Sequence, residues 1–251
     1  MIGVVGDAFI DRWVFGSVDR IAPEADCPVL RQERTEHHPG GADHVVEAVR
    51  RLGVLTLSLY EGRRHVKTRY VGRQQILRVD DESVAPIGLE AEDWIYTRMT
   101  QSTVRALVLS DYDKGVFKGS LAQRLITWAL QQKIPTIVDP KGPWSRYANC
   151  SVITPNTKEL NGAEPQRLIE TYGFGAVLET RGDKGMCLHV PGQTIDIPPV
   201  PASCIDVTGA GDCVVAAIAV KLVAGWSLPD AAQFANAFAA RSTEKWGTKC
   251  P

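Results

Sequence analysis

Short apolar segments alternate with helix-like segments through the middle of the chain, and this order limits the folds open to it. We predict helices over residues 90–102 and 121–132, and strands over residues 106–109, 136–138 and 152–154. Strands that alternate with helices usually form a parallel sheet through right-handed crossovers, so the order predicts an α/β fold. The carboxyl ends of such strands share one edge of the sheet, where ligands bind.

Further elements extend this pattern toward both ends of the chain. Strands are predicted over residues 2–5, 54–60, 176–179, 186–190 and 194–197, and helices over residues 42–52, 213–223 and 229–245. Residues 66–71 and 74–79 alternate apolar with polar side chains, which is typical of a hairpin that partly faces solvent. We interpret this hairpin as a flap outside the core.

Charge and cysteine usage exclude several classes of protein. The formal net charge is −1, from 28 basic and 29 acidic residues, which gives no bulk attraction to nucleic acid or to an anionic membrane. We therefore expect a small-molecule substrate. The six cysteines lack Cys-x-x-Cys spacing, so their pattern indicates neither a zinc site nor a disulfide framework. No segment resembles a signal peptide or a membrane span, and we expect a cytoplasmic protein.

The sequence Asp-Val-Thr-Gly-Ala-Gly-Asp at residues 206–212 precedes a long apolar run. Gly209 and Gly211 allow a sharp turn into a helix whose first amides have no partner within the helix. Such amides can hold an anion, and Asp212 beside them could accept a proton, which suits phosphoryl transfer to a hydroxyl. The alternative is an ordinary helix start. The stretch matches neither a dinucleotide fingerprint nor a Walker-type P-loop.

Polar side chains follow the predicted strands at several points. Any one of them has a simpler interpretation, because Asp, Asn and Pro commonly end strands and begin helices. Together with the glycine turn they indicate a binding site at one edge of the sheet. They are Asp7, Asp11, Ser110, Asp111, Asp139, Lys141, Thr154, Asn156 and Thr180.

Four motifs in order along the chain resemble the ribokinase-type (PfkB) carbohydrate kinases. They are Asp11, the pair Gly40-Gly41, Asn156-Thr157-Lys158-Glu159 and Gly209-Ala210-Gly211-Asp212. The resemblance implies a ribokinase-like, Rossmann-type three-layer sandwich with a mainly parallel central sheet and a small β lid. It also implies one kinase domain over residues 1–251, with lid strands at about residues 13–36 and 65–80.

Longer stretches are similar to the bacterial D-glycero-β-D-manno-heptose 7-phosphate kinases, namely residues 6–12, 23–25, 74–80, 110–115 and 139–142. This similarity implies ATP-dependent phosphorylation of the C1 hydroxyl to the 1,7-bisphosphate, a precursor of ADP-heptose and lipopolysaccharide. Because the chain has no His-x-Gly-His motif, we expect the kinase part without a fused nucleotidyltransferase. Two alternatives stay open: a ribokinase-like kinase for another sugar or sugar phosphate, and a catalytically weak sugar- or nucleotide-binding protein on the same scaffold.

The resemblance assigns a role to each matching residue. Asp212 is the expected catalytic base, and the amides of Gly209, Ala210 and Gly211 form the expected anion hole. Asn156 and Glu159 are expected to position Mg²⁺ through water. The residues expected at the sugar phosphate are Asp11, Gly40, Gly41, His44, Lys67, Arg69, Arg78, Asp111, Lys114 and Lys141. Those expected at the nucleotide are Asn156, Thr180, Gly182, Gly185 and Asn236.

The chain departs from the family pattern at three places. His44 stands where the family has a sugar-binding asparagine, and the segments over residues 54–65 and 162–175 are shorter than in relatives. These departures leave open the acceptor sugar, a monovalent cation requirement, and a homodimer formed through the flap. Lys67, Arg69 and Arg78 suit either a distal phosphate or a solvated strand face.

Overall fold

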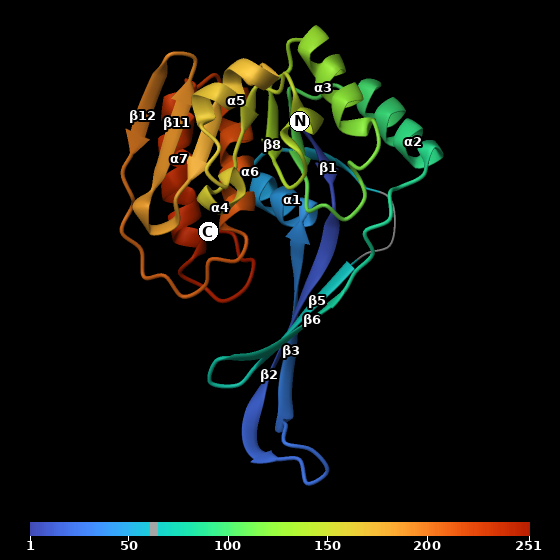
Figure 1. Cartoon of the computed structure of the whole chain (residues 1–251), viewed down its shortest axis with the longest axis vertical. Coiled ribbons are helices and arrows are strands. Elements are labelled where there is room, and N and C mark those ends of the chain that lie inside the picture. Colours follow the sequence, from blue (N-terminus) through green and yellow to red (C-terminus); the bar gives the residue numbers. More distant parts are fainter. Residues whose placement is uncertain (61–64) are drawn as a thin grey trace.

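The computed structural model describes residues 1–60 and 65–251, and a four-stranded sheet projects from an α/β body (Figure 1). The central sheet of the body has the order β12-β11-β10-β9-β8-β7-β1-β4. Its strands from β1 to β10 pair in parallel, and β11 and β12 form an antiparallel hairpin at one edge. The strand bounds are β1 Ile2–Gly6, β4 Thr56–Leu59, β7 Ala106–Ser110, β8 Thr136–Asp139, β9 Val152–Ile153, β10 Val177–Thr180, β11 Met186–Val190 and β12 Gln193–Ile197. The predicted α/β fold with a mainly parallel sheet is confirmed.

Helices cover both faces of this sheet. One layer holds α1 (Ala42–Arg51), α6 (Ala210–Val223) and α7 (Leu228–Ser242). The other holds α2 (Leu89–Thr100), α3 (Leu121–Gln131) and α5 (Pro165–Tyr172). The short α4 (Thr157–Leu160) and two single 3₁₀ turns, η1 (Trp144–Tyr147) and η2 (Gly182–Lys184), lie in connections. None of the helices in the described residues has the length and apolar character needed to span a bilayer.

Alternation of side chains along the central strands builds the two apolar layers. In β7, Ala106 and Val108 pack with the α1 and α6 side, whereas Leu107 and Leu109 pack with the α2 and α3 side. Successive strand residues point to opposite faces, so a fully apolar strand supplies both layers at once. This is why the predicted central strands are uniformly apolar.

The second sheet, which we call the lid sheet, has the order β3-β2-β5-β6. Its strands are β2 (Ala8–Ile21), β3 (Pro28–Gly41), β5 (His65–Val71) and β6 (Gln75–Asp81). The hairpin predicted over residues 66–71 and 74–79 corresponds to β5 and β6. Only Asp7 separates β1 from β2, and β3 leads directly into α1. The lid sheet therefore leaves the body at the edge where the parallel strands end.

Four helices differ from the predictions, and two of the differences are small: α7 ends at Ser242 instead of residue 245, and the four-residue α4 was not predicted. Helix α6 begins at Ala210 instead of residue 213, because Gly209 adopts a left-handed conformation with φ 80° and ends the preceding turn. Helix α5 was not predicted, although Pro165 stands at its first turn and Gly173 ends it in a left-handed conformation. This helix occupies the shortened segment over residues 162–175. Residues 61–64 of the other shortened segment lie outside the described residues.

Candidate active site

Asp212 lies in the first turn of α6, and only 1% of its surface is exposed. Gly209 is the N-cap of this helix. A Cβ atom on Gly211 would meet no atom within 4 Å, so open space adjoins the turn. The Ala210 amide donates a hydrogen bond to the Val207 carbonyl at 3.2 Å. The structure thus places a buried carboxylate in the first turn of the helix beside open space, and the Ala210 amide has a partner in the preceding turn.

Both carboxylate oxygens of Asp212 have hydrogen-bond partners. The Tyr112 hydroxyl donates to Oδ1 at 2.9 Å, and His44 Nδ1 lies 3.0 Å from Oδ2. Burial, with Asp212 and Asp139 nearby, raises the pKa of Tyr112 well above its usual range, so the phenol stays a donor. Burial alone would lower the pKa of His44, but its hydrogen bonds to Asp212 and Cys250 raise it to about 10. Asp212 is therefore held between two donors.

Asp11 of β2 and Arg69 of β5 form a buried ion pair at the base of the lid sheet. Burial raises the pKa of Asp11, and the Arg69 charge opposes this shift. The Lys67 ammonium lies 4.8 Å from the centre of the Phe9 ring, and burial lowers its pKa. Arg78 lies on β6, where it donates to Asp80 at 2.8 and 2.6 Å. Asp11, Lys67 and Arg69, all predicted at the substrate, therefore lie on the adjacent strands β2 and β5.

Gly40 and Gly41 are required by close packing at the end of β3. A Cβ on Gly40 would lie 2.2 Å from the Phe9 ring, and a Cβ on Gly41 would lie 2.3 Å from the Asp7 carbonyl oxygen. Gly41 also has a φ of 60°, which glycine adopts without strain. The pair brings α1, and with it His44, against the carboxyl end of β1.

The loop after β7 is organised by two buried aspartates. Asp7 accepts backbone hydrogen bonds from Tyr112, Lys114 and Val116 at 2.9 to 3.2 Å. Asp111 accepts from Arg146 at 2.7 Å and from the Tyr147 hydroxyl at 2.5 Å. The Lys114 ammonium donates to Glu82 at 2.5 Å. Asp111 and Lys114, both predicted at the substrate, thus have partners within the chain, and the loop fixes Tyr112 next to Asp212.

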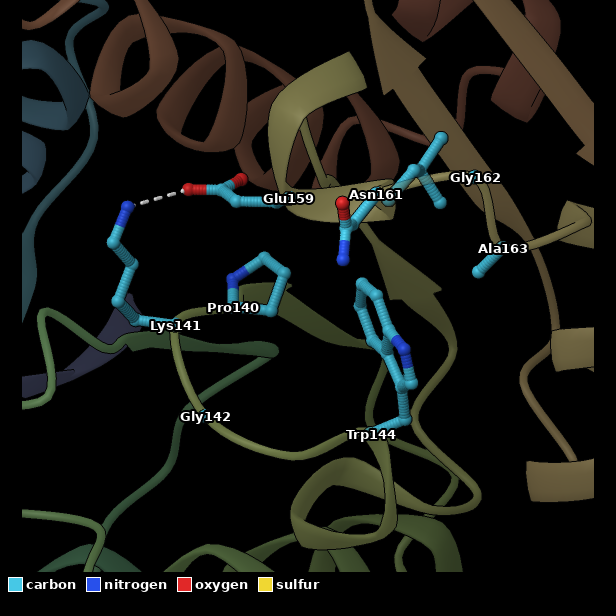
Figure 2. A pocket seen from close by; sticks show the side chains of 9 residues that line it. Pro140, Lys141, Gly142, Trp144, Glu159, Asn161, Gly162 and Ala163 are labelled. Atoms are coloured by element: carbon cyan, nitrogen blue, oxygen red, sulfur yellow. Dashed lines mark hydrogen bonds and ion pairs between the residues drawn. The ribbon is translucent and has the colours of Figure 1, made fainter.

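A pocket of about 520 Å³ lies where the chain leaves β8 and β9. Its lining includes Lys141 and Trp144 on one side, and Glu159 and Asn161 on the other (Figure 2). Lys141 Nζ donates to Glu159 Oε1 at 2.9 Å. Glu159 Oε2 accepts the Asn156 amide, and Asn156 Oδ1 accepts the Glu159 amide, which is a capping box for α4. The Asn-x-x-Glu motif therefore places one carboxylate oxygen at the pocket.

Asp139, at the end of β8, interacts electrostatically both with Asp212 and with Glu159 at the pocket. Burial, with Asp212 and Glu159 nearby, holds its pKa well above the usual range, and Lys141 opposes the shift. Repulsion among these three carboxylates would be relieved by a cation. A hydrated divalent ion fits such a set, because carboxylate oxygens and water are the ligands that Mg²⁺ prefers.

The remaining predicted nucleotide residues lie around β10 and α7. Thr180 ends β10 and forms a bridge with Asn156. Gly182 is the first residue of the η2 turn and Gly185 follows its last, both with positive φ. Asn236 of α7 is buried and donates to the Pro198 carbonyl at 2.7 Å. These residues lie on the β10–β12 side of the fold.

Tyr112, Asp139, Cys213 and Cys250 contact or face the predicted site residues, but sequence reasoning assigned none of them a role. Asp139 was among the polar residues predicted at strand ends, and Tyr112 also follows a predicted strand, so the same argument could have included it. Cys213 directly follows Asp212. Cys250 is more than two hundred positions from its contact His44, and no spacing rule connects them.

A helix start beside a buried carboxylate, at the carboxyl edge of a parallel sheet that carries a β lid, is the arrangement of an α/β sugar kinase. Residues 63–251 match the pfkB family of carbohydrate kinases, and the chain belongs to this family.

Individual relatives agree with this membership. The chain is 38% identical to the bifunctional protein HldE of Paramagnetospirillum magneticum, over 99% of this chain and 60% of that protein. It thus spans about three fifths of the length of that relative. Phosphofructokinase-2 from Escherichia coli, solved in complex with potassium, has a TM-score of 0.77 at 20% identity, over 100% and 95% of the two chains. Arabidopsis thaliana ribokinase, complexed with ribose and ATP, has a TM-score of 0.71 at 17% identity, over 98% and 93%. The likeness to these two structures shows that the fold is the ribokinase fold.

Proposed function

We propose that the chain is an ATP-dependent kinase that phosphorylates the C1 hydroxyl of D-glycero-β-D-manno-heptose 7-phosphate in the cytoplasm. The observation that carries the proposal is Asp212, which is buried in the first turn of α6 beside the open space at Gly211. The heptose-kinase stretches of the sequence and the similarity to HldE support this substrate. The product would be the 1,7-bisphosphate, a precursor of ADP-heptose.

Asp212 takes the proton of the sugar hydroxyl. An ionised carboxylate has about four acceptor positions, so it can accept a hydroxyl while His44 and Tyr112 keep their hydrogen bonds. These two partners hold the carboxylate in one orientation. The amides of Gly209, Ala210 and Gly211 stabilise the charge that develops during transfer, and Ala210 gives up its bond to Val207 to do so.

The nucleotide and metal belong on the side of the site formed by Asn156 and Glu159. When bound, ATP supplies the phosphoryl group, and Mg²⁺ offsets its negative charge. Glu159 and Asn156 hold the ion through water. Lys141, which pairs with Glu159 in the absence of ligand, would move to a phosphate oxygen when the nucleotide binds. Thr180, Gly182, Gly185 and Asn236 bind the nucleotide. Because a related fold was solved with potassium, the activity should also be compared with and without a monovalent cation.

The lid sheet supplies the sugar contacts. Asp11 orients sugar hydroxyls, and Arg69 keeps the Asp11 carboxylate charged and in place. Lys67 and Arg78 meet the distal phosphate. Gly40 and Gly41 close the site from the end of β3. His44, Asp111 and Lys114 support the residues that contact the sugar phosphate. The exposed strand β6 is also the proposed surface for a homodimer, which analytical ultracentrifugation tests.

A coupled ADP-release assay over a panel of sugars and sugar phosphates tests the proposal. We expect turnover with heptose 7-phosphate, and we expect Asp212→Asn to lower kcat by about 10²–10⁴-fold, the usual contribution of a general base. Asp93→Asn is the matched control, because Asp93 lies on α2 and pairs with Arg124. Turnover of another sugar alone would assign a different acceptor. Unchanged activity of Asp212→Asn would show that Asp212 is not the catalytic base.

A catalytically weak binding protein is the second candidate. It is favoured by the two segments, over residues 54–65 and 162–175, that are shorter than in relatives. Calorimetry separates the two functions, since sugar or nucleotide binding without any phosphorylation would support the second.

A further inference from the structure

Three side chains with soft or borderline metal-binding atoms meet behind Asp212. They are His44 of α1, Cys213 of α6 and Cys250 near the end of the chain. One ligand atom of each lies within 4.8 Å of the other two, and all three residues are buried. We infer that these residues form a binding site for Zn²⁺ or a similar thiophilic divalent cation. The inference goes beyond the proposed function, which uses neither thiol.

The distances suit tetrahedral coordination. Zinc binds sulfur at ~2.3 Å and imidazole nitrogen at ~2.0 Å, which separates neighbouring ligand atoms by about 3.5–3.8 Å. His44 Nε2 and Cys250 Sγ are 3.3 Å apart, and the whole set fits within 4.8 Å. Small side-chain adjustments would therefore bring the three atoms into one coordination sphere.

Asp212 orients the histidine for this role. Its carboxylate lies 3.0 Å from His44 Nδ1. With Nδ1–H donating to this carboxylate, Nε2 becomes the electron-pair donor when metal binding displaces its proton. Nε2 is the ring nitrogen that faces Cys250. Histidine ligands of metals commonly donate their other ring N–H to a carboxylate in this way. The cluster thus contains both the ligands and a group that fixes one of them.

Charge and packing also favour a cation here. Two thiolates balance the charge of a divalent ion, so the loaded site adds no net charge to a buried region. A Cβ on Gly209 would lie 2.4 Å from the Cε1 atom of His44, so glycine at this position makes room for the ring. The terminal segment is anchored, because Thr248 donates to the Pro39 carbonyl at 2.7 Å and Gly247 donates to Asp206 at 3.0 Å. Cys250 is thereby held against α1.

The cysteine spacing had indicated no zinc site. That rule detects ligands supplied by local motifs, whereas these ligands come from two helices and a terminal segment that only the fold brings together. A metal at this place would fix the His44 ring and, through it, the orientation of Asp212.

The test is titration of the reduced chain over residues 1–251 with Co²⁺ or Cd²⁺ alone, without sugar or nucleotide. We expect one metal per chain, a thiolate-to-metal charge-transfer band, and visible Co²⁺ bands of tetrahedral intensity. Cys213→Ser and Cys250→Ser should each abolish stoichiometric binding. Cys187→Ser, a buried cysteine of β11, is the control that should retain it. Asp212→Asn should weaken binding about 10–100-fold, as loss of a supporting carboxylate does.

Absence of a charge-transfer band in the folded wild-type chain would overturn the inference, as would equal loss in Cys187→Ser. A Cys213–Cys250 disulfide that forms in place of metal binding would also overturn it. Circular dichroism checks that each variant folds. X-ray absorption of the Zn²⁺-loaded wild-type chain, with two sulfur and one imidazole ligand expected, needs no variant. Since no step uses a kinase substrate, failure of the proposed function would not alter this result.

Discussion

The α/β body and the lid sheet are stabilised by different interactions. Every residue of β1 and β7 is buried in the body, whereas every residue of β6 in the lid sheet is exposed. Apolar layers cover both faces of the central sheet. The lid sheet relies on strand pairing and on contacts of charged side chains. One example is the cation–π contact of the Arg34 guanidinium, 4.0 Å from the centre of the Phe15 ring. The body can therefore maintain the fold while the lid sheet varies with its ligands.

The change from buried packing to exposed strands takes place within the lid sheet. Near the body, Asp11 and Trp13 of β2 and Thr68 and Arg69 of β5 are buried. Farther out, β2 ends in an exposed stretch from residue 18 to residue 21. The base of the lid sheet is thus packed like the body but with charged groups inside, and it adjoins Asp212. We expect substitutions at this base to affect both stability and activity.

Arg69→Met should have the largest effect on stability, and it tests whether the lid base behaves like the body. It leaves the buried Asp11 carboxylate without its ion-pair partner, which typically costs about 3–5 kcal/mol. The double variant Asp11→Asn/Arg69→Met should recover most of the loss, because no unpaired charge remains. Urea unfolding of the four chains of this cycle measures the coupling.

The same variant has a predicted pH dependence. Burial raises the pKa of Asp11 even with Arg69 present, and removing Arg69 raises it further. Asp11 in the folded variant then binds a proton more tightly than it does in the unfolded chain. The stability of the variant therefore falls as the pH rises from the ordinary pKa of an aspartate to the raised pKa of Asp11 in the folded state. The destabilisation should shrink at acidic pH. A loss that is independent of pH would contradict an unpaired Asp11 charge.

Ile137→Ala in the body should cost about 2–5 kcal/mol, because it removes a fully buried side chain of β8 and leaves a cavity. Leu77→Ala on β6 is the matched lid variant, since Leu77 is 54% exposed, and it should change the free energy of unfolding by less than about 0.5 kcal/mol. Chemical denaturation compares the two. Similar losses would mean that the outer lid sheet is part of the cooperative core.

This contrast explains how much of the fold sequence reasoning could reach. The central strands are apolar at successive positions and alternate with helices, so β7, β8 and α3 were predicted within a few residues of their ends. The long β2–β3 pair depends on strand pairing over its whole length, and α5 has only eight residues. Local patterns carry little information about the strand pair, and in α5 the local signals are the flanking Pro165 and Gly173.

The candidate site divides in the same way. Asp212, Asn156 and Glu159 belong to compact motifs, so the residues themselves indicated a helix start and an acidic group. The partners of these groups could not be predicted, because His44 and Tyr112 reach Asp212 from segments that are distant in the sequence. His44 was expected to contact sugar, but its two ring nitrogens instead face Asp212 and Cys250.

Arg78→Gln should have little effect on stability, and it separates binding from folding in the lid sheet. Arg78 and its partner Asp80 lie on exposed β6 with side chains 47% and 23% exposed, so the free energy of unfolding should change by less than about 1 kcal/mol. If Arg78 meets the distal phosphate, KM for heptose 7-phosphate should rise about 10–100-fold, the usual effect of losing one charge-assisted hydrogen bond. Arg31→Gln removes a more exposed arginine of the lid sheet, which faces Asp19 at 4.0 Å, and it should leave KM unchanged. Equal KM values for both variants would assign Arg78 to a solvated strand face, and the polar surface of β6 would then serve solubility or pairing with a second subunit.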